Sequence, residues 1–196
     1  AAIARSSNRA IVFVRTKRAA DRVASDLRRE DVEAASIHGD LRQSHREKAL
    51  ADFGAGKLKV LVATDVAARG IHVDDVDVVI HYDPPEDHKA YLHRSGRTAR
   101  AGAAGTVITL MTPEQERDVR DLTRAAGIKP TITRVDALGH PVLSQLAPGE
   151  RVLVPGGIVV EAPRPATGST GGGGGAAGGG GGRNRNRRRS GSGSGS

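Results

Sequence analysis

An eight-residue segment rich in arginine offers the clearest chemistry in this sequence. Residues 93–100 read HRSGRTAR, with three arginines at a spacing of three. On a helix, Arg97 and Arg100 fall on nearly the same face. A guanidinium is planar, permanently charged and able to make two parallel hydrogen bonds, so two of them side by side form a clamp for a phosphoryl group during its transfer. The alternative is a solvated basic helix face, because short motifs also arise by chance.

Three further segments precede this octad in a fixed order. They read AIVFVRTKRAAD (10–21), HGDLRQSHREKALADF (38–53) and ATDVAARGIHV (63–73). Thr64 follows an apolar run, where a hydroxyl and nearby backbone amides can meet a phosphate oxygen. Gly39 lies in a turn, where the missing side chain permits close backbone approach.

Apolar runs alternate with helix-patterned segments along most of the chain. Strands are predicted at 11–14, 33–37, 59–63, 77–80 and 105–111. Helices are predicted after a cap at Thr16, from a capping box of Ser44 and Glu47, over 87–99, and over 113–126 with Gly127 as the stop. This alternation indicates an α/β layered fold with a mostly parallel central sheet flanked by helices. Ligand groups then belong in loops at the carboxyl ends of the strands, where the segments named above lie.

Composition limits the class of protein. The chain has 196 residues, no cysteine and a formal net charge of +8. Without cysteine, disulfides and thiolate metal sites are excluded, and a cytoplasmic protein is expected. No apolar run approaches the length of a membrane span, so we expect a soluble protein with no membrane partner. The positive charge favours a polyanionic partner, and nucleic acid is the default candidate.

The C-terminal part of the chain has a different composition. After a predicted domain over 1–130, residues 131–161 indicate an irregular extension, with strand character at 132–135 and 151–160. Residues 162–196 are predicted to form a disordered Gly/Ser/Arg-rich basic tail, because they cannot bury enough apolar area to offset the entropy of ordering. Its arginine cluster is a candidate RNA contact on charge grounds, against the alternative of a solubilising tail. The cluster consists of Arg183, Arg185, Arg187, Arg188 and Arg189.

Together, the octad and the three segments resemble the second RecA-like domain of superfamily-two helicases, most closely that of the DEAD-box ATP-dependent RNA helicases. They correspond to that family's motifs IV, IVa, V and VI, and the resemblance covers about residues 8–126. Four ordered motifs are far more specific than any one of them. The resemblance implies a RecA-like fold and ATP-driven unwinding of short RNA duplexes. A DNA-directed translocase of the same superfamily and a non-catalytic RNA-binding or annealing module remain alternatives.

The resemblance also implies a role for each motif residue. Arg97 and Arg100 would act as arginine fingers on the γ-phosphate. The residues implied to bind the nucleotide or to order its site are His93, Arg94, Arg69, Gly70, His72 and Asp74. The residues implied to line or couple to the RNA groove are Gly39, Gln43, Arg46 and Thr64. The family usually has a ribose-binding aspartate where this chain has His72, and Asp74 and Asp75, just downstream, are the alternatives for that contact. Arg46 is alternatively an ordinary helix-surface arginine.

Two motifs of a complete helicase ATPase do not occur in this sequence. It contains neither a Gly-x-x-x-x-Gly-Lys-Ser/Thr loop nor an Asp-Glu-Ala-Asp run. By the resemblance, both belong to an N-terminal RecA-like domain, and we expect this chain to be a C-terminal fragment of a longer protein. ATP with Mg²⁺ is the expected cofactor, with the metal ligands in that other domain and no metal site here. The fragment alone is expected to be inactive.

Overall fold

The structure is a computed structural model. It describes residues 1–69, 73, 76–99, 105–137 and 139–147. The chain divides into two units, Ala1–Leu153 and Val154–Ser196, and every described residue lies in the first. The predicted strand at 151–160 and the predicted tail at 162–196 therefore fall outside the described residues. Within the described part, no helix is both long enough and apolar enough to cross a membrane.

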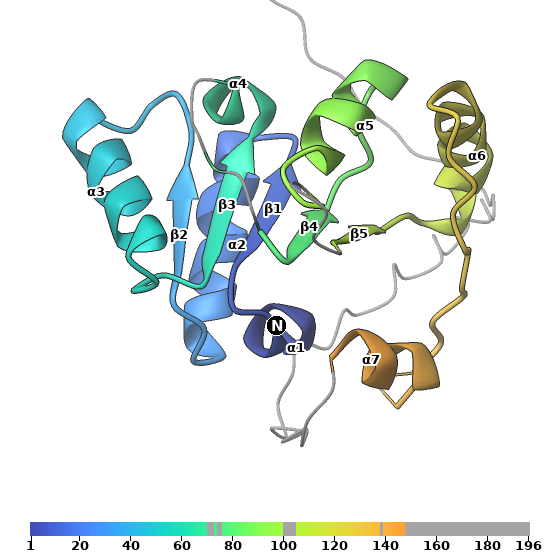
Figure 1. Ribbon diagram of the computed structural model, residues 1–196, viewed down its shortest axis with the longest axis horizontal. Coiled ribbons are helices and arrows are strands. Elements are labelled where there is room, and N and C mark those ends of the chain that lie inside the picture. The colour runs from blue at the N-terminus through green and yellow to red at the C-terminus, as the bar shows by residue number, and fades with distance from the viewer. Residues whose placement is uncertain (70–72, 74–75, 100–104, 138, 148–196) are drawn as a thin grey trace, which may run out of the picture. The chain divides into compact units, whose positions relative to one another are not determined.

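Helices and strands alternate through the described part of the chain (Figure 1). The strands are β1 (Ala10–Val14), β2 (Ala34–Ile37), β3 (Val60–Thr64), β4 (Val78–His81) and β5 (Thr106–Thr109). The helices are α1 (Ala2–Ser6), α2 (Lys17–Arg29), α3 (Gln43–Gly54), α4 (Asp65–Ala68), α5 (His88–Ser95), α6 (Glu116–Ala125) and α7 (Pro141–Leu146). A single 3₁₀ turn, η1 (Pro113–Gln115), leads into α6.

The strands form one parallel sheet in the order β2-β3-β1-β4-β5. In the central strand, Val12 pairs with Val62 of β3 on one side and with Ile80 of β4 on the other. Every residue of β1 is buried, as expected for a parallel strand that is covered on both faces. Because all the strands run the same way, their carboxyl ends meet at one edge of the sheet.

Helices cover both faces of the sheet. Side chains alternate along a strand, so neighbouring residues of β1 point to opposite faces. Val12 and Val14 pack against α2 on one face. Ile11 and Phe13 pack against α3 and α4 on the other. The structure is therefore the layered α/β fold that the sequence predicts.

Two local predictions are wrong. Ser44 and Glu47 do not form a capping box, because α3 begins earlier, with Arg42 at its N-cap and no side-chain cap bond. Glu47 instead accepts a hydrogen bond from Gln43 Nε2 at 2.8 Å, one turn away on the same helix. The predicted strand at 132–135 has no strand pairing among the described residues.

The helix predicted over 87–99 is shorter than expected. α5 ends at Ser95, and residues 96–99 form a turn. The arginine-rich octad is therefore divided between a helix and the turn that follows it. Two short helices are not predicted from the sequence, α1 at the start and α7 within the irregular extension. Helices of one or two turns are too short to show a helical repeat.

Candidate active site and nucleic-acid interface

Arg94 connects the helix α5 to the loop after β3. Its side chain is 3% exposed. Nε and Nη2 donate to the two carboxylate oxygens of Asp65 at 2.7 and 2.5 Å, and Nη1 donates to the Asp83 carbonyl at 2.9 Å. The guanidinium also lies over the Phe13 ring, 5.2 Å from its centroid. A buried cation with this many partners is a structural anchor. The bonds of Arg94 are thus internal, and its part in ordering the nucleotide site stays a prediction.

Arg97 lies in the turn after α5 and is half-buried. Its Nη2 donates to the carbonyl of Ala68, the last residue of α4, at 3.2 Å. Its own carbonyl accepts a hydrogen bond from the amide of Val76 at 3.3 Å. The predicted arginine finger is therefore held against α4 by its side chain and against Val76, just before β4, by its backbone.

A small cationic pocket lies between α4 and α5. Arg97, Arg69 and His93 line it together with the Arg94–Asp65 pair, and its volume is about 20 Å³. Arg69 and His93 are exposed. The volume admits one water and is far below the several hundred Å³ of a typical ligand site. Guanidinium groups suit the oxygens of a phosphate, so the residues fit the phosphates of ATP as one wall of a site, without enclosing them.

The turn that carries Arg97 is closely approached by Gly105, the residue before β5. Thr98 is buried, and its hydroxyl donates to the Val76 carbonyl. A Cβ at Gly105, just before β5, would lie 2.2 Å from Thr98 Oγ1. Ala99 has a φ of 56°, a left-handed conformation that costs alanine about 1–2 kcal/mol. The glycine and the buried hydroxyl therefore hold the turn in a shape that its own sequence disfavours.

Several predicted site residues lie outside the described residues. They are Arg100, Gly70, His72, Asp74, Arg183, Arg185, Arg187, Arg188 and Arg189. Their contacts with nucleotide or RNA stay predictions. Within the described part of the chain, no group of three or more His, Cys, Asp or Glu side chains could hold a metal ion.

The predicted RNA-contacting residues lie at the carboxyl ends of β2 and β3 and at the start of α3. Thr64 ends β3 and precedes α4, and its hydroxyl caps no amide of that helix. Gly39 is exposed, and a Cβ built on it meets nothing within 4 Å. The fold therefore does not require glycine there, whereas a closely approaching ligand would. Gln43 is exposed, and Arg46 is half-buried with an Nε that has no partner among the described residues.

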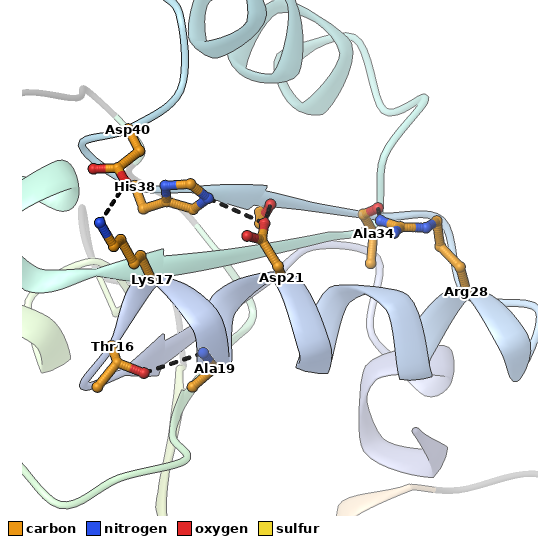
Figure 2. A network of polar contacts seen from close by, with 9 residues as sticks. Thr16, Lys17, Ala19, Asp21, Arg28, Ala34, His38 and Asp40 are labelled. Atoms are coloured by element: carbon orange, nitrogen blue, oxygen red, sulfur yellow. Dashed lines mark hydrogen bonds and ion pairs between the residues drawn. The ribbon is translucent and has the colours of Figure 1, made fainter.

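Polar contacts that the sequence did not reveal join α2 to the loop after β2 (Figure 2). Asp21 accepts a hydrogen bond from the Ser36 hydroxyl at 2.6 Å, and its carboxylate lies 3.0 Å from Nε2 of buried His38. Lys17 forms an ion pair with Asp40. The bond from Ser36, and then that from His38, lower the pKa of Asp21, and Lys17 lowers the pKa of Asp40. The turn with the predicted RNA-contacting glycine is thus anchored on both sides.

His81 is a fully buried polar residue at the end of β4. Its Nδ1 lies 3.0 Å from the Thr109 hydroxyl. Its ring meets those of Phe13 and Tyr91 edge-on, with centroids 6.2 and 5.1 Å away. Burial, and then the nearby charge of Arg94, lower the pKa of His81 to about 3. The residue is therefore neutral at physiological pH and belongs to the packing beneath the site.

Comparison with known proteins agrees with this arrangement. The chain matches the helicase conserved C-terminal domain family over residues 2–102. The ATP-dependent RNA helicase dbp2 of Aspergillus clavatus is 48% identical over 116 residues, which are 59% of this chain and 21% of that protein. The chain thus spans about a fifth of the length of the curated relatives it matches.

Solved structures of DEAD-box proteins share the fold. One is the E. coli DEAD-box protein SrmB bound to regulator of ribonuclease activity A, with 37% identity, a TM-score of 0.59 and coverage of 74% of this chain and 81% of that chain. Another is S. cerevisiae Dbp5 bound to RNA and ADP BeF3, with 32% identity, a TM-score of 0.58 and coverage of 64% and 34%.

The parallel sheet and the motif segments at its carboxyl edge define a RecA-like helicase domain. The chain belongs to the helicase conserved C-terminal domain family, in the form found in DEAD-box ATP-dependent RNA helicases. The resemblance predicted from the four motifs is confirmed.

Proposed function

We propose that the chain works as the second RecA-like domain of an ATP-dependent RNA helicase. It would supply arginine fingers and part of the RNA groove for ATP-driven unwinding of short duplexes. A Walker-type loop, a DEAD run and the ligands of Mg²⁺ would come from an N-terminal RecA-like partner domain. The observation that carries this proposal is the wall of Arg69, His93 and Arg97 around a pocket of about 20 Å³. Such a wall binds a nucleotide only opposite a second domain.

In this proposal, ATP supplies the phosphoryl group whose transfer to water drives the cycle. Arg97 and Arg100 donate hydrogen bonds to the oxygens of that group and stabilise its developing charge. Arg69 and His93 extend the same wall. Arg94 acts as a positioning residue, because its bonds to Asp65 hold α5, and with it Arg97, against the loop after β3. A ribose contact falls to His72 or Asp74, and the glycine of the Arg69-Gly70 pair permits close approach there.

The RNA groove would run along the carboxyl ends of β2 and β3. Thr64 and Gly39 would contact the RNA backbone, while Gln43 and Arg46 would couple the groove to the nucleotide site. Backbone contacts are independent of base sequence. The relatives named ATP-dependent RNA helicases, and a related structure with bound RNA, favour RNA over DNA as the substrate. The arginines of the tail would add electrostatic affinity for the same polyanion.

The test is Arg97→Ala in the full-length protein. Loss of one arginine finger lowers the rate of phosphoryl transfer by roughly 10³–10⁵, so RNA-stimulated phosphate release should fall to background. RNA affinity should change little, since Arg97 belongs to the proposed nucleotide site and not to the proposed RNA groove. Arg117 is an exposed arginine on α6 away from that wall. Arg117→Ala is the matched control and should hydrolyse ATP at the normal rate.

A non-catalytic RNA-binding or annealing module is the competing function, and it depends on the basic tail. That function requires no phosphoryl transfer, so Arg97→Ala would have no effect on it, and removal of residues 162–196 would abolish RNA binding. Normal RNA-stimulated turnover in the Arg97→Ala protein would therefore reject the function proposed here. A cytoplasmic location is part of the same proposal, since a chain without cysteine suits a reducing compartment.

A further inference from the structure

A second, larger groove lies at the carboxyl edge of the sheet, between the loop after β4 and the helix α6. Its volume is about 480 Å³, which is within the range of sites that hold a small ligand or a peptide side chain. Its apolar lining comes from Pro84, Pro85, Val119 and Leu122. Pro85 and Val119 are buried, so they form its base. The nucleotide wall described above shares none of these residues.

Carboxylates surround this apolar base. Glu86, Asp118 and Asp121 are exposed and line the groove. Asp121 pairs with Arg124, but the side chains of Glu86 and Asp118 form no hydrogen bond or ion pair with any of the described residues. Arg15 is the one lysine or arginine among the lining residues. The groove is therefore locally acidic in a chain whose net charge is +8.

An acidic groove with an apolar base does not suit nucleic acid. Phosphates would meet like charge at Glu86 and Asp118, and the lining offers no phenylalanine, tyrosine or tryptophan ring on which a base could stack. The complementary ligand carries positive charge around an aliphatic side chain, so that the aliphatic group enters the groove and the cations meet the carboxylates.

We propose that this groove is a docking site for a basic peptide segment of a partner protein, one with arginines on either side of a leucine-like anchor. The anchor packs on Val119 and Leu122, and the guanidinium groups bind Glu86 and Asp118. The site requires neither ATP nor RNA, so its test is independent of the helicase function proposed above.

The probe is a fluorescein-labelled nonapeptide, Gly-Arg-Arg-Leu-Arg-Arg-Leu-Arg-Gly, with a second peptide in which serine replaces both leucines. Binding to the whole chain is measured by fluorescence anisotropy at low salt. The expected result is saturable binding of the leucine peptide and at least tenfold weaker binding of the serine peptide. Neutralising the two unpaired carboxylates, as Glu86→Gln with Asp118→Asn, should weaken binding of the leucine peptide by about tenfold.

The matched control neutralises two exposed carboxylates elsewhere. Glu33 precedes β2 at the opposite edge of the sheet, and Asp136 lies in the irregular chain after α6. Glu33→Gln with Asp136→Asn should leave peptide affinity unchanged. Equal binding of the two peptides, or equal weakening in both double variants, would mean attraction by charge alone and would overturn the proposal. So would a loss of single-stranded RNA binding in the Glu86→Gln, Asp118→Asn protein, because the groove would then serve RNA.

Discussion

The two described arginines of the octad differ because of what surrounds each one. Arg94 is 3% exposed and bonded through two nitrogens to Asp65. Arg97, three residues later, is half-buried and reaches a carbonyl of α4 beside the cationic pocket. Burying a cation is costly unless its partners are complete, and Arg94 has the Asp65 carboxylate on one side of its fork and the Asp83 carbonyl on the other. Arg94 thus joins α5 to the loop after β3, whereas the part of Arg97 in phosphoryl transfer stays a proposal.

His81 gives the stability of the chain a measurable pH dependence. Burial, with Arg94 nearby, lowers its pKa to about 3 in the folded protein, against an ordinary value of 6.5. Between those pH values the unfolded chain binds one proton more than the folded chain. Above pH 6.5 the titration of His81 therefore takes nothing from the free energy of unfolding. As the pH falls from 6.5 toward 3, the free energy of unfolding decreases by up to about 5 kcal/mol. Urea unfolding from about pH 7 down to about pH 4 measures this loss.

The control for this measurement is His81→Asn, which retains a hydrogen-bonding side chain toward Thr109 but does not titrate. The other histidines contribute equally to both proteins. The free energy of unfolding of the unmodified chain should fall by about 1.4 kcal/mol per pH unit more steeply than that of the variant. Parallel curves for the two proteins would contradict a buried neutral histidine.

At the level of elements, the turn after α5 depends on β5, which follows it in the chain. A Cβ at Gly105 would lie 2.2 Å from Thr98 Oγ1 and 2.6 Å from the Ala99 amide nitrogen. In Gly105→Ala, either β5 or the turn must therefore move. We expect a loss of about 1–3 kcal/mol in the free energy of unfolding. In the full-length protein, RNA-stimulated ATP hydrolysis should also fall, because the turn positions Arg97.

Gly139 supplies the matched control for this substitution. It precedes α7, and a Cβ built on it meets nothing within 4 Å. Gly139→Ala should leave the free energy of unfolding within about 0.5 kcal/mol of that of the unmodified protein. Its rate of ATP hydrolysis should be unchanged. If Gly105→Ala behaves in the same way, the close approach of β5 does not fix the turn.

At the level of the whole molecule, the contribution of the tail's charge to RNA affinity can be separated from that of the proposed RNA groove at β2 and β3. Residues 162–196 contain six arginines and no acidic residue. If each arginine neutralises one phosphate of single-stranded RNA, removal of the six should reduce the steepness with which log affinity falls against log salt by up to about 4. Salt titrations of RNA binding, with and without residues 162–196, measure that change.

A tail of the same length with glutamine in place of its arginines separates charge from chain length. It should show the same reduced slope as the truncated chain. An unchanged slope in either protein would mean that the tail arginines do not contact the RNA, and RNA affinity would then depend on the groove at β2 and β3.

Predictions from local pattern succeeded where the cause of structure is local. The apolar run of β1 is a buried central strand, and Thr16 caps α2 by accepting from the Ala19 amide at 3.1 Å. The same reasoning failed at Ser44, because the Ser-x-x-Glu pattern of a capping box also fits the interior of a helix. It missed the pairing of Asp65 with Arg94 because 29 residues separate them and neither spacing nor composition relates them.

Sequence alone determined the alternation of strands and helices, the family, and the arginine types available for phosphate chemistry, because these depend on local periodicity and on short ordered motifs. Tertiary structure decided which arginine is buried, which carboxylate holds it, and where an acidic groove forms on a basic chain. Those features arise only when parallel strands bring loops that are distant in sequence to one edge, where burial and neighbouring charge assign each side chain its role.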